Sequence, residues 1–202
     1  MNSYITRLTP NSNKWEKPSG HDCKCGLNTN SPYEGVYGFG WEEWLFNDYH
    51  NASSQLDGYC YGFIQAFHKQ NNDLNKIKTL HLYSRLCGEK GRKNYYLGYI
   101  QNLEIVKPPI TTKSLNEKKN AFFKKAYIDL NNAQIEGFEN DLNEMFNEDT
   151  LFNVRFKPTD VHISDFNFQT RPITIGQGQS RFKLYDLEKH VNLHNEINQY
   201  LY

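Results

Sequence analysis

The 202-residue chain contains no long apolar run and few groups that could crosslink it. No segment approaches the roughly 20 apolar residues that a membrane span needs, and the first residues do not form an apolar signal segment. These absences predict a cytoplasmic protein without a membrane partner. The four cysteines are Cys23, Cys25, Cys60 and Cys87. We interpret them as thiols, because a chain of this length without a secretion signal has little need of disulfides.

Common catalytic signatures are missing as well. The sequence has no G-x-S-x-G nucleophile elbow and no G-x-x-x-x-G-K-[ST] phosphate loop. The glycine-rich segment 176–180 is not followed by the lysine that a phosphate loop requires. From these absences we assign no catalytic residue and expect no cofactor.

The formal net charge is zero, but the charges are unevenly distributed along the chain. Up to Lys125 there are 17 Lys and Arg against 11 Asp and Glu, and from Ala126 onward there are 6 against 12. An asymmetry of this kind indicates one basic face, as expected for a surface that binds nucleic acid. The alternative is that the two halves neutralise each other within the fold.

The most distinctive feature that is present is a block dense in glycine and aromatic residues, from Tyr33 to Tyr49. Glycine permits sharp turns and close approach of the backbone to another surface. Tryptophan and tyrosine supply flat faces with polar tips, which suit either a core or stacking against a planar ligand. Aromatic residues make up 15% of the chain, so they must carry much of the core in either case.

The order of predicted elements favours an α+β fold in one domain, 1–202. Its centre would be a curved mixed or antiparallel sheet, or a barrel, with flanking helices. The second of the strands that follow the aromatic block has apolar residues on both faces, which predicts cover on both sides. Strands are expected at 3–8, 59–68, 76–86, 94–106, 151–157, 160–166 and 181–184. Helices are expected at 40–47, from Ser114, at 133–146 and after Asp186, with a long loop at 9–34 and a helical insertion at 114–148.

Two sets of residues are candidates for binding. Aromatic side chains that could enclose a flat base, with two carboxylates as polar readers, are Trp15, Tyr33, Tyr37, Trp41, Tyr59, Tyr61, Asp48 and Asp57. Cations that could reach phosphates from the turn between two strands, or from the later strand, are Arg85, Lys90, Arg92, Lys93 and Arg155. Core packing is the alternative for the aromatic residues, and a solvated hairpin is the alternative for the cations.

A metal site is the weakest candidate. His21, Cys23 and Cys25 lie close together in the long loop, and such ligands can bind zinc. The paired C-x-x-C pattern is missing, so the fold would have to supply a fourth ligand. We therefore predict no metal and keep this trio as the alternative.

Four segments give the chain a resemblance to a known family. These are GFGWEEWLFN at 38–47, GYCYGFIQ at 58–65, YYLGYI at 95–100 and FNVRFK at 152–157. Together they resemble the N-terminal modules that precede HNH nuclease domains in modification-dependent restriction endonucleases of the McrA kind. The H-N-H catalytic segment with its zinc cysteines is absent from this chain.

The resemblance implies a DNA-binding module of the PUA-like superfamily, which includes the SRA and EVE domains. It implies a curved β-barrel with helices at its edge and a pocket for a modified or flipped base. DNA would then be the partner, and a linked or separate nuclease would perform any cleavage in a restriction or defence system. The alternatives are an enzyme that processes a nucleotide or small ligand, with or without zinc, and a protein-interaction domain.

Overall fold

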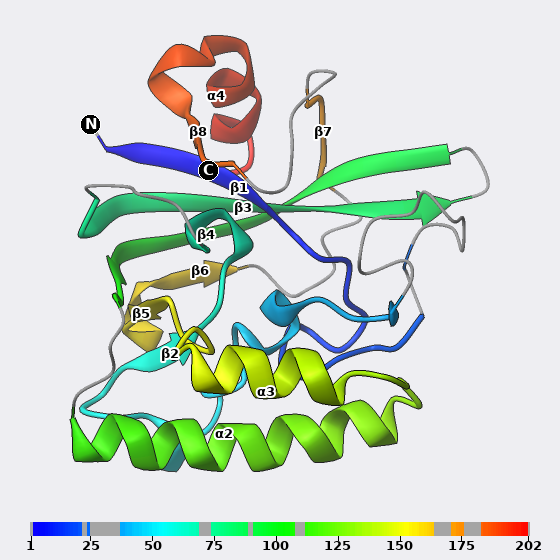
Figure 1. The fold of residues 1–202 in the computed structure, drawn as a ribbon. Helices are drawn as coiled ribbons and strands as arrows, with labels where there is room; N and C mark the ends of the chain where they lie inside the picture. The colour runs from blue at the N-terminus through cyan, green and yellow to red at the C-terminus, as the bar shows by residue number, and fades with distance from the viewer. Residues whose placement is uncertain are drawn as a thin grey trace.

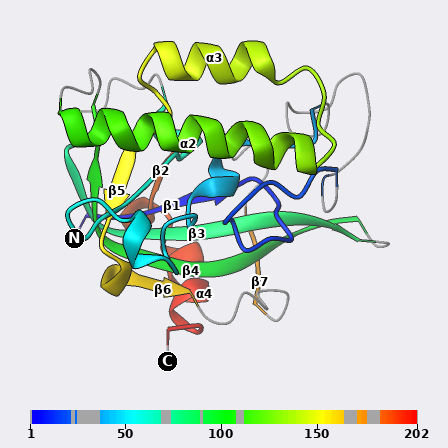
Figure 2. The same cartoon turned by 90° about the horizontal axis from the view of Figure 1, so that it is seen from below.

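The computed structural model describes residues 2–21, 24, 37–68, 74–88, 91–107, 112–163, 171–175 and 183–201. Within this part of the chain, a mixed sheet lies between helices on its two faces (Figure 1). The helices α2 (Lys113–Asn132) and α3 (Glu139–Asn147) run side by side on one face. The short helix α4 (Val191–Asn198) lies on the other face, as the turned view also shows (Figure 2).

The sheet has eight strands among the described residues, in the order β2-β5-β4-β3-β1-β8, with β6 and β7 also paired to β4. Strand β1 is parallel to β3, and the other pairings are antiparallel. The α+β class and the mixed sheet are therefore confirmed, while the strand path is open and a PUA-like barrel is not confirmed. The strands are β1 Ser3–Leu8, β2 Cys60–Gly62, β3 Lys76–Gly88, β4 Gly91–Ile105, β5 Val154–Phe156, β6 Val161–Ile163, β7 Pro172–Ile173 and β8 Tyr185–Asp186.

The long hairpin of β3 and β4 is the centre of the sheet, and apolar clusters cover both of its faces. Leu80 and Leu82 belong to the cluster on the α2 and α3 side, whereas Tyr83 belongs to the cluster beneath α4. A bulge shifts the register between Leu82 and Tyr83. This arrangement confirms the prediction that the strand is covered on both sides.

One predicted strand and one predicted helix differ from the structure. The segment 59–68 is extended only over β2 and then forms a 3-10 turn, η3 (Gln65–Phe67), and β2 pairs with the distant β5 rather than with β3. The helix expected at 40–47 is a short 3-10 helix, η1 (Trp41–Trp44), followed by turns. Other single 3-10 turns are η2 Ala52–Ser54, η4 Pro158–Asp160 and η6 Leu187–Lys189.

The helix boundaries also move. Thr112, not Ser114, caps α2, because its side-chain oxygen accepts from the backbone N–H of Leu115. Helix α3 begins at Glu139 rather than near Ala133. Asp186 caps the turn η6 before α4. No helix in the part of the chain described here is long and apolar enough to cross a membrane.

The described part of the predicted loop 9–34 packs into the protein. Thr9 and Asn11 are buried, and Trp15 is fully buried in the cluster between the sheet and the helices. The Trp15 indole N–H donates to the Thr9 carbonyl at 2.8 Å, and the Asn11 side chain accepts from the Trp15 backbone N–H at 2.9 Å. This segment therefore forms a wall of the core.

Candidate functional site

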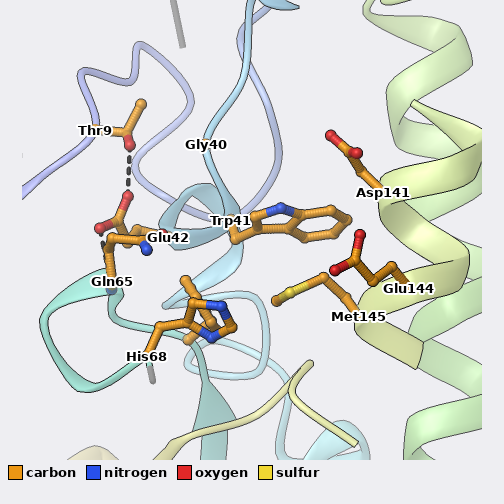
Figure 3. A pocket seen from close by; sticks show the side chains of 10 residues that line it. Thr9, Gly40, Trp41, Glu42, Gln65, His68, Asp141, Glu144 and Met145 are labelled. Carbon is orange, nitrogen blue, oxygen red and sulfur yellow. Dashed lines mark hydrogen bonds between the residues drawn. The ribbon is translucent and has the colours of Figure 1, made fainter. Parts of the chain in front are cut away.

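A pocket of about 270 Å³ lies between η1 and α3. The start of η1, within the aromatic block, forms one wall, and one side of α3 forms the other (Figure 3). Its chemical character is mixed, because an indole face and several carboxyl groups share one cavity. The lining residues are Thr9, Gly40, Trp41, Glu42, Phe63, Gln65, His68, Asp141, Glu144 and Met145.

Glu42 is the buried polar group of this pocket. Its side chain is only 2% exposed, and burial raises the pKa of its carboxyl group. The Thr9 hydroxyl donates to one carboxyl oxygen at 2.5 Å, and the Gln65 backbone N–H donates to the other at 3.1 Å (Figure 3). These donors partly offset the cost of burial. They fix the carboxyl group at the pocket wall.

The close contact of Thr9 and Glu42 depends on Gly40. A Cβ atom at position 40 would overlap the Thr9 side chain. Glycine has no such atom, so the end of β1 can approach the start of η1. The glycine of the G-F-G-W sequence thus positions the pocket carboxyl group.

The neighbouring Glu43 points away from the pocket and organises the N-terminal segment. Its carboxylate is fully buried and accepts hydrogen bonds from Asn11, Ser19, Lys24 and the Gly40 backbone N–H. The Lys24 ammonium lies 2.8 Å from it, with both side chains buried. Glu43 is therefore a structural residue, although it is adjacent to the pocket residue in sequence.

The indole of Trp41 is held between other rings. It stacks on Trp44 with a centroid distance of 5.8 Å and an interplanar angle of 28°, and Phe39 meets it edge-on at 5.3 Å. Trp44 is itself anchored, because its indole N–H donates to Asp129 of α2 at 2.8 Å. Trp41 is 9% exposed, so a limited face reaches the pocket on a rigid support.

Helix α3 supplies the acidic wall. Asp141 and Glu144 lie three residues apart and project toward the Trp41 indole, with Met145 beside them (Figure 3). His68 lies on the opposite side and contacts the ring of Phe63 at a centroid distance of 5.4 Å. Together with Glu42, these groups make a pocket rich in acceptors. Such a pocket favours a planar ligand with amino groups or positive charge and disfavours a phosphate.

The predicted aromatic set does not form a single pocket. Trp41 lines the cavity, but the ring of Trp15 is 0% exposed and has no face for a ligand, so its predicted role is corrected to core packing. Tyr37 is 40% exposed and Asp57 lies in an exposed turn, and neither lines the pocket. Tyr33 lies outside the described residues.

Tyr59 and Tyr61 belong to a separate cluster around Arg155, and Asp48 accepts from the Tyr61 backbone N–H at 3.4 Å. The guanidinium of Arg155 is 2.7 Å from a Glu104 carboxylate oxygen, donates to the Tyr61 hydroxyl at 3.3 Å, and lies 4.6 Å from the centre of the Tyr59 ring. These contacts pair Arg155 with Glu104, and its side chain is 39% exposed, so its role as a phosphate contact stays a prediction. Asp48 is buried and forms a 2.5 Å ion pair with Lys118 of α2.

Three of the remaining predicted phosphate contacts, Arg85, Arg92 and Lys93, lie on the β3–β4 hairpin. Arg85 is half-buried and its Nε–H donates to Asn94 on the facing strand at 2.9 Å, while Lys93 is exposed. Arg92 is part of β4, paired with Cys87, and Lys90 lies outside the described residues. Both views show the described end of this hairpin on the same side of the molecule as the start of α3 (Figures 1 and 2).

The candidate metal trio is only partly described. His21 is exposed, and its ring lies against Gly38. Cys23 and Cys25 lie outside the described residues. Among the residues that are described, no three His, Cys, Asp or Glu side chains gather as metal ligands would.

Most of the pocket was not predicted from the sequence. Thr9, Glu42, Gln65, His68, Asp141 and Glu144 come from four separate segments, and the acidic face of α3 is typical of a solvated helix. One available signal was the pair of carboxylates inside the aromatic run from Phe39 to Phe46. Charged residues at such a position must be paired or functional.

No protein-family model, curated protein or solved structure matches this chain.

Proposed function

We propose that this chain is a DNA-binding module in which the Trp41 pocket receives a modified base turned out of the duplex. The observation that carries the proposal is the presence of a rigid indole face and the buried carboxyl group of Glu42 in one cavity of about 270 Å³. Enzymes and readers that extrude a base hold it by stacking and by hydrogen bonds to its edge. A carboxylate accepts from an exocyclic amino group such as that of cytosine.

The acidic wall supports selection of the base edge. Asp141 and Glu144 add acceptors to Glu42, so a base that presents an amino group is favoured over one that presents only carbonyl oxygens. The same carboxylates repel phosphate from the pocket mouth. The DNA backbone would therefore lie beside the pocket, and the hairpin that carries Lys93 is on the same side of the molecule.

The wider assignment depends on the sequence resemblance alone. On that basis we propose that the open sheet is a divergent relative of the PUA-like barrel. The protein would act in the cytoplasm as the specificity part of a restriction or defence system, with the nuclease linked or separate. It would need no cofactor.

A second candidate is a site for a small amino-bearing heterocycle that is not part of DNA, either bound or processed. The three carboxyl groups and His68 around one cavity favour this candidate, because they suit a cationic ligand and include groups that can transfer protons. The two candidates differ in their need for phosphates and hence for the hairpin cations.

A gel-shift panel tests the proposal. One duplex sequence is prepared with unmodified cytosine, 5-methylcytosine, 5-hydroxymethylcytosine or N6-methyladenine, and the protein is titrated against each. We expect at least one modified duplex to bind about tenfold or more tightly, the scale on which a pocket discriminates one small substituent. Weak and identical binding to all four duplexes, together with micromolar binding of a free nucleoside, would favour the second candidate.

A further inference from the structure

A second pocket lies on the opposite face of the sheet, beside α4. Its volume is about 300 Å³, and its floor is the edge of β4 between the places where β6 and β7 pair with that strand. None of its residues belongs to the Trp41 pocket. Its lining includes four aromatic rings and one cation, which are Tyr96, Tyr99, His162, Tyr200 and Arg171.

The rings form two stacked pairs. Tyr99 and His162 lie opposite each other in the β4–β6 pairing, with centroids 4.6 Å apart and planes at 20°. Tyr96 and Tyr200 stack at 5.9 Å, also at 20°. The Tyr200 hydroxyl donates to the Pro172 carbonyl at 2.6 Å. The aromatic walls are therefore held from both strands and from the end of α4.

The backbone is shaped to bring β6 close. Gly98 has φ +137°, and a Cβ atom there would overlap the His162 carbonyl. Only glycine adopts this conformation without strain. The close approach places His162 and Tyr99 as neighbouring rings at the pocket edge.

Arg171 provides positive charge at this site. Its backbone carbonyl accepts from the Tyr96 N–H at 2.8 Å, which fixes the start of β7, and its guanidinium lies 6.0 Å from the centre of the Tyr200 ring. Within the described residues the side chain of Arg171 forms no ion pair, unlike Arg155. A half-buried guanidinium beside aromatic faces suits a phosphate attached to a planar ring.

We propose that this pocket is a second binding site, for a nucleotide unit whose base contacts Tyr99, His162 and Tyr200 and whose phosphate pairs with Arg171. Its ligand chemistry is opposite to that of the Trp41 pocket, because the cation selects phosphate whereas the carboxylates there repel it. The nucleotide unit can be free or part of a single strand, since both present the same ring and phosphate. The site does not depend on the function proposed for Trp41.

Isothermal titration calorimetry with adenosine 5′-monophosphate, adenosine and a short single strand of deoxyadenylate tests the proposal. We expect the monophosphate to bind more tightly than adenosine. Arg171→Gln should weaken the monophosphate about tenfold or more and leave adenosine nearly unchanged, while Arg171→Lys should retain part of the preference. If the single strand binds much more tightly than the monophosphate and its affinity falls with added salt, the ligand of this site is a single strand. If the strand and the monophosphate bind with equal affinity per site, the ligand is a free nucleotide.

Two further variants locate the site. Tyr200→Leu should weaken both the monophosphate and adenosine. Tyr200→Phe should weaken them much less, because it keeps the ring and loses only the hydroxyl bond to Pro172. Lys113→Ala changes an exposed residue that lines neither pocket and should leave both affinities unchanged. The loss of monophosphate affinity in Arg171→Gln does not involve the Trp41 pocket, so failure of the Trp41 proposal would not affect that result. If the monophosphate does not bind at millimolar concentration, or binds Arg171→Gln as well as wild type while that variant keeps its circular dichroism spectrum, the proposal is wrong.

Discussion

Thr9 and Glu42 are 33 residues apart in sequence, and the hydroxyl of one donates a 2.5 Å hydrogen bond to the carboxyl group of the other. Thr9 follows directly after β1, and Glu42 lies in η1, so this bond joins the end of β1 to the pocket wall. Both side chains are buried. The bond therefore supports the fold and the orientation of the carboxyl group at once.

Replacing Thr9 with Val should reveal both contributions. Thr9→Val keeps the shape of the side chain but removes the donor, so a buried carboxyl group loses one of its hydrogen bonds. We expect the free energy of unfolding to fall by about 1–3 kcal/mol in urea denaturation at neutral pH. Thr9→Ser keeps the hydroxyl and should lose much less. Equal losses in the two variants would show that packing of the methyl group, not the hydrogen bond, matters here.

The raised pKa of Glu42 predicts a pH dependence of stability. Its folded pKa lies above the ordinary glutamate value of 4.5 because the carboxyl group is buried, so the folded protein holds this proton more tightly than the unfolded chain does. The stabilisation of the fold by this bound proton is fully present below pH 4.5 and is lost as the pH rises through the folded pKa.

Comparison with Glu42→Gln isolates this effect, because glutamine does not titrate. As the pH rises above 4.5, the wild type should lose stability relative to Glu42→Gln until the folded pKa is passed. Unfolding free energies of both proteins at a series of pH values provide the measurement. A stability difference that stays constant with pH, or changes in the other direction, would contradict the assigned shift.

Glu43 should be far more important for stability than an exposed glutamate. Glu43→Gln leaves the buried Lys24 ammonium without its carboxylate, and breaking a buried pair costs about 3–5 kcal/mol. The control is Glu117→Gln, which removes an exposed ion pair with Lys113 and should cost less than about 0.5 kcal/mol. Thermal unfolding followed by circular dichroism compares the two. A similar small loss in both would show that Lys24 finds another partner.

The central hairpin could be predicted because its information is local. Alternating apolar residues and a short polar turn define β3 and β4, and the structure extends each by only a few residues. The pairing of β2 with β5 could not be predicted, since it joins Cys60 to Phe156 and no local pattern specifies such a partner. β2 is short for the same reason, because its length is set by the three residues that pair with β5.

The pocket was harder to predict than the sheet because adjacent residues have different roles. Glu42 and Glu43 are alike in sequence, yet one faces the pocket and the other the N-terminal segment. The acidic residues of α3 match a solvated face, and only the position of Trp41 opposite them makes Asp141 and Glu144 a wall. Trp15 shows the reverse, since a tryptophan in a polar loop proved to be core.

The proposed phosphate contact on the hairpin can be tested through salt dependence. Lys93→Ala should weaken DNA binding and reduce the slope of log affinity against log salt by about 1, as expected for one lost phosphate contact. Lys113→Ala removes an exposed lysine at the start of α2, away from the hairpin, and should leave the slope unchanged. Fluorescence anisotropy at several salt concentrations gives both slopes. An unchanged slope in Lys93→Ala would refute the phosphate role.

Trp41 gives the most direct test of the base pocket. The measurement is the affinity of wild type, Trp41→Phe and Trp41→Leu for the modified duplex that binds best in the gel-shift panel and for its unmodified counterpart. Stacking contributes about 1–3 kcal/mol per base, so Trp41→Leu should lose most of the preference for the modified duplex, and Trp41→Phe should keep part of it. A folded Trp41→Leu variant that retains the full preference would contradict the proposal that Trp41 stacks on the modified base.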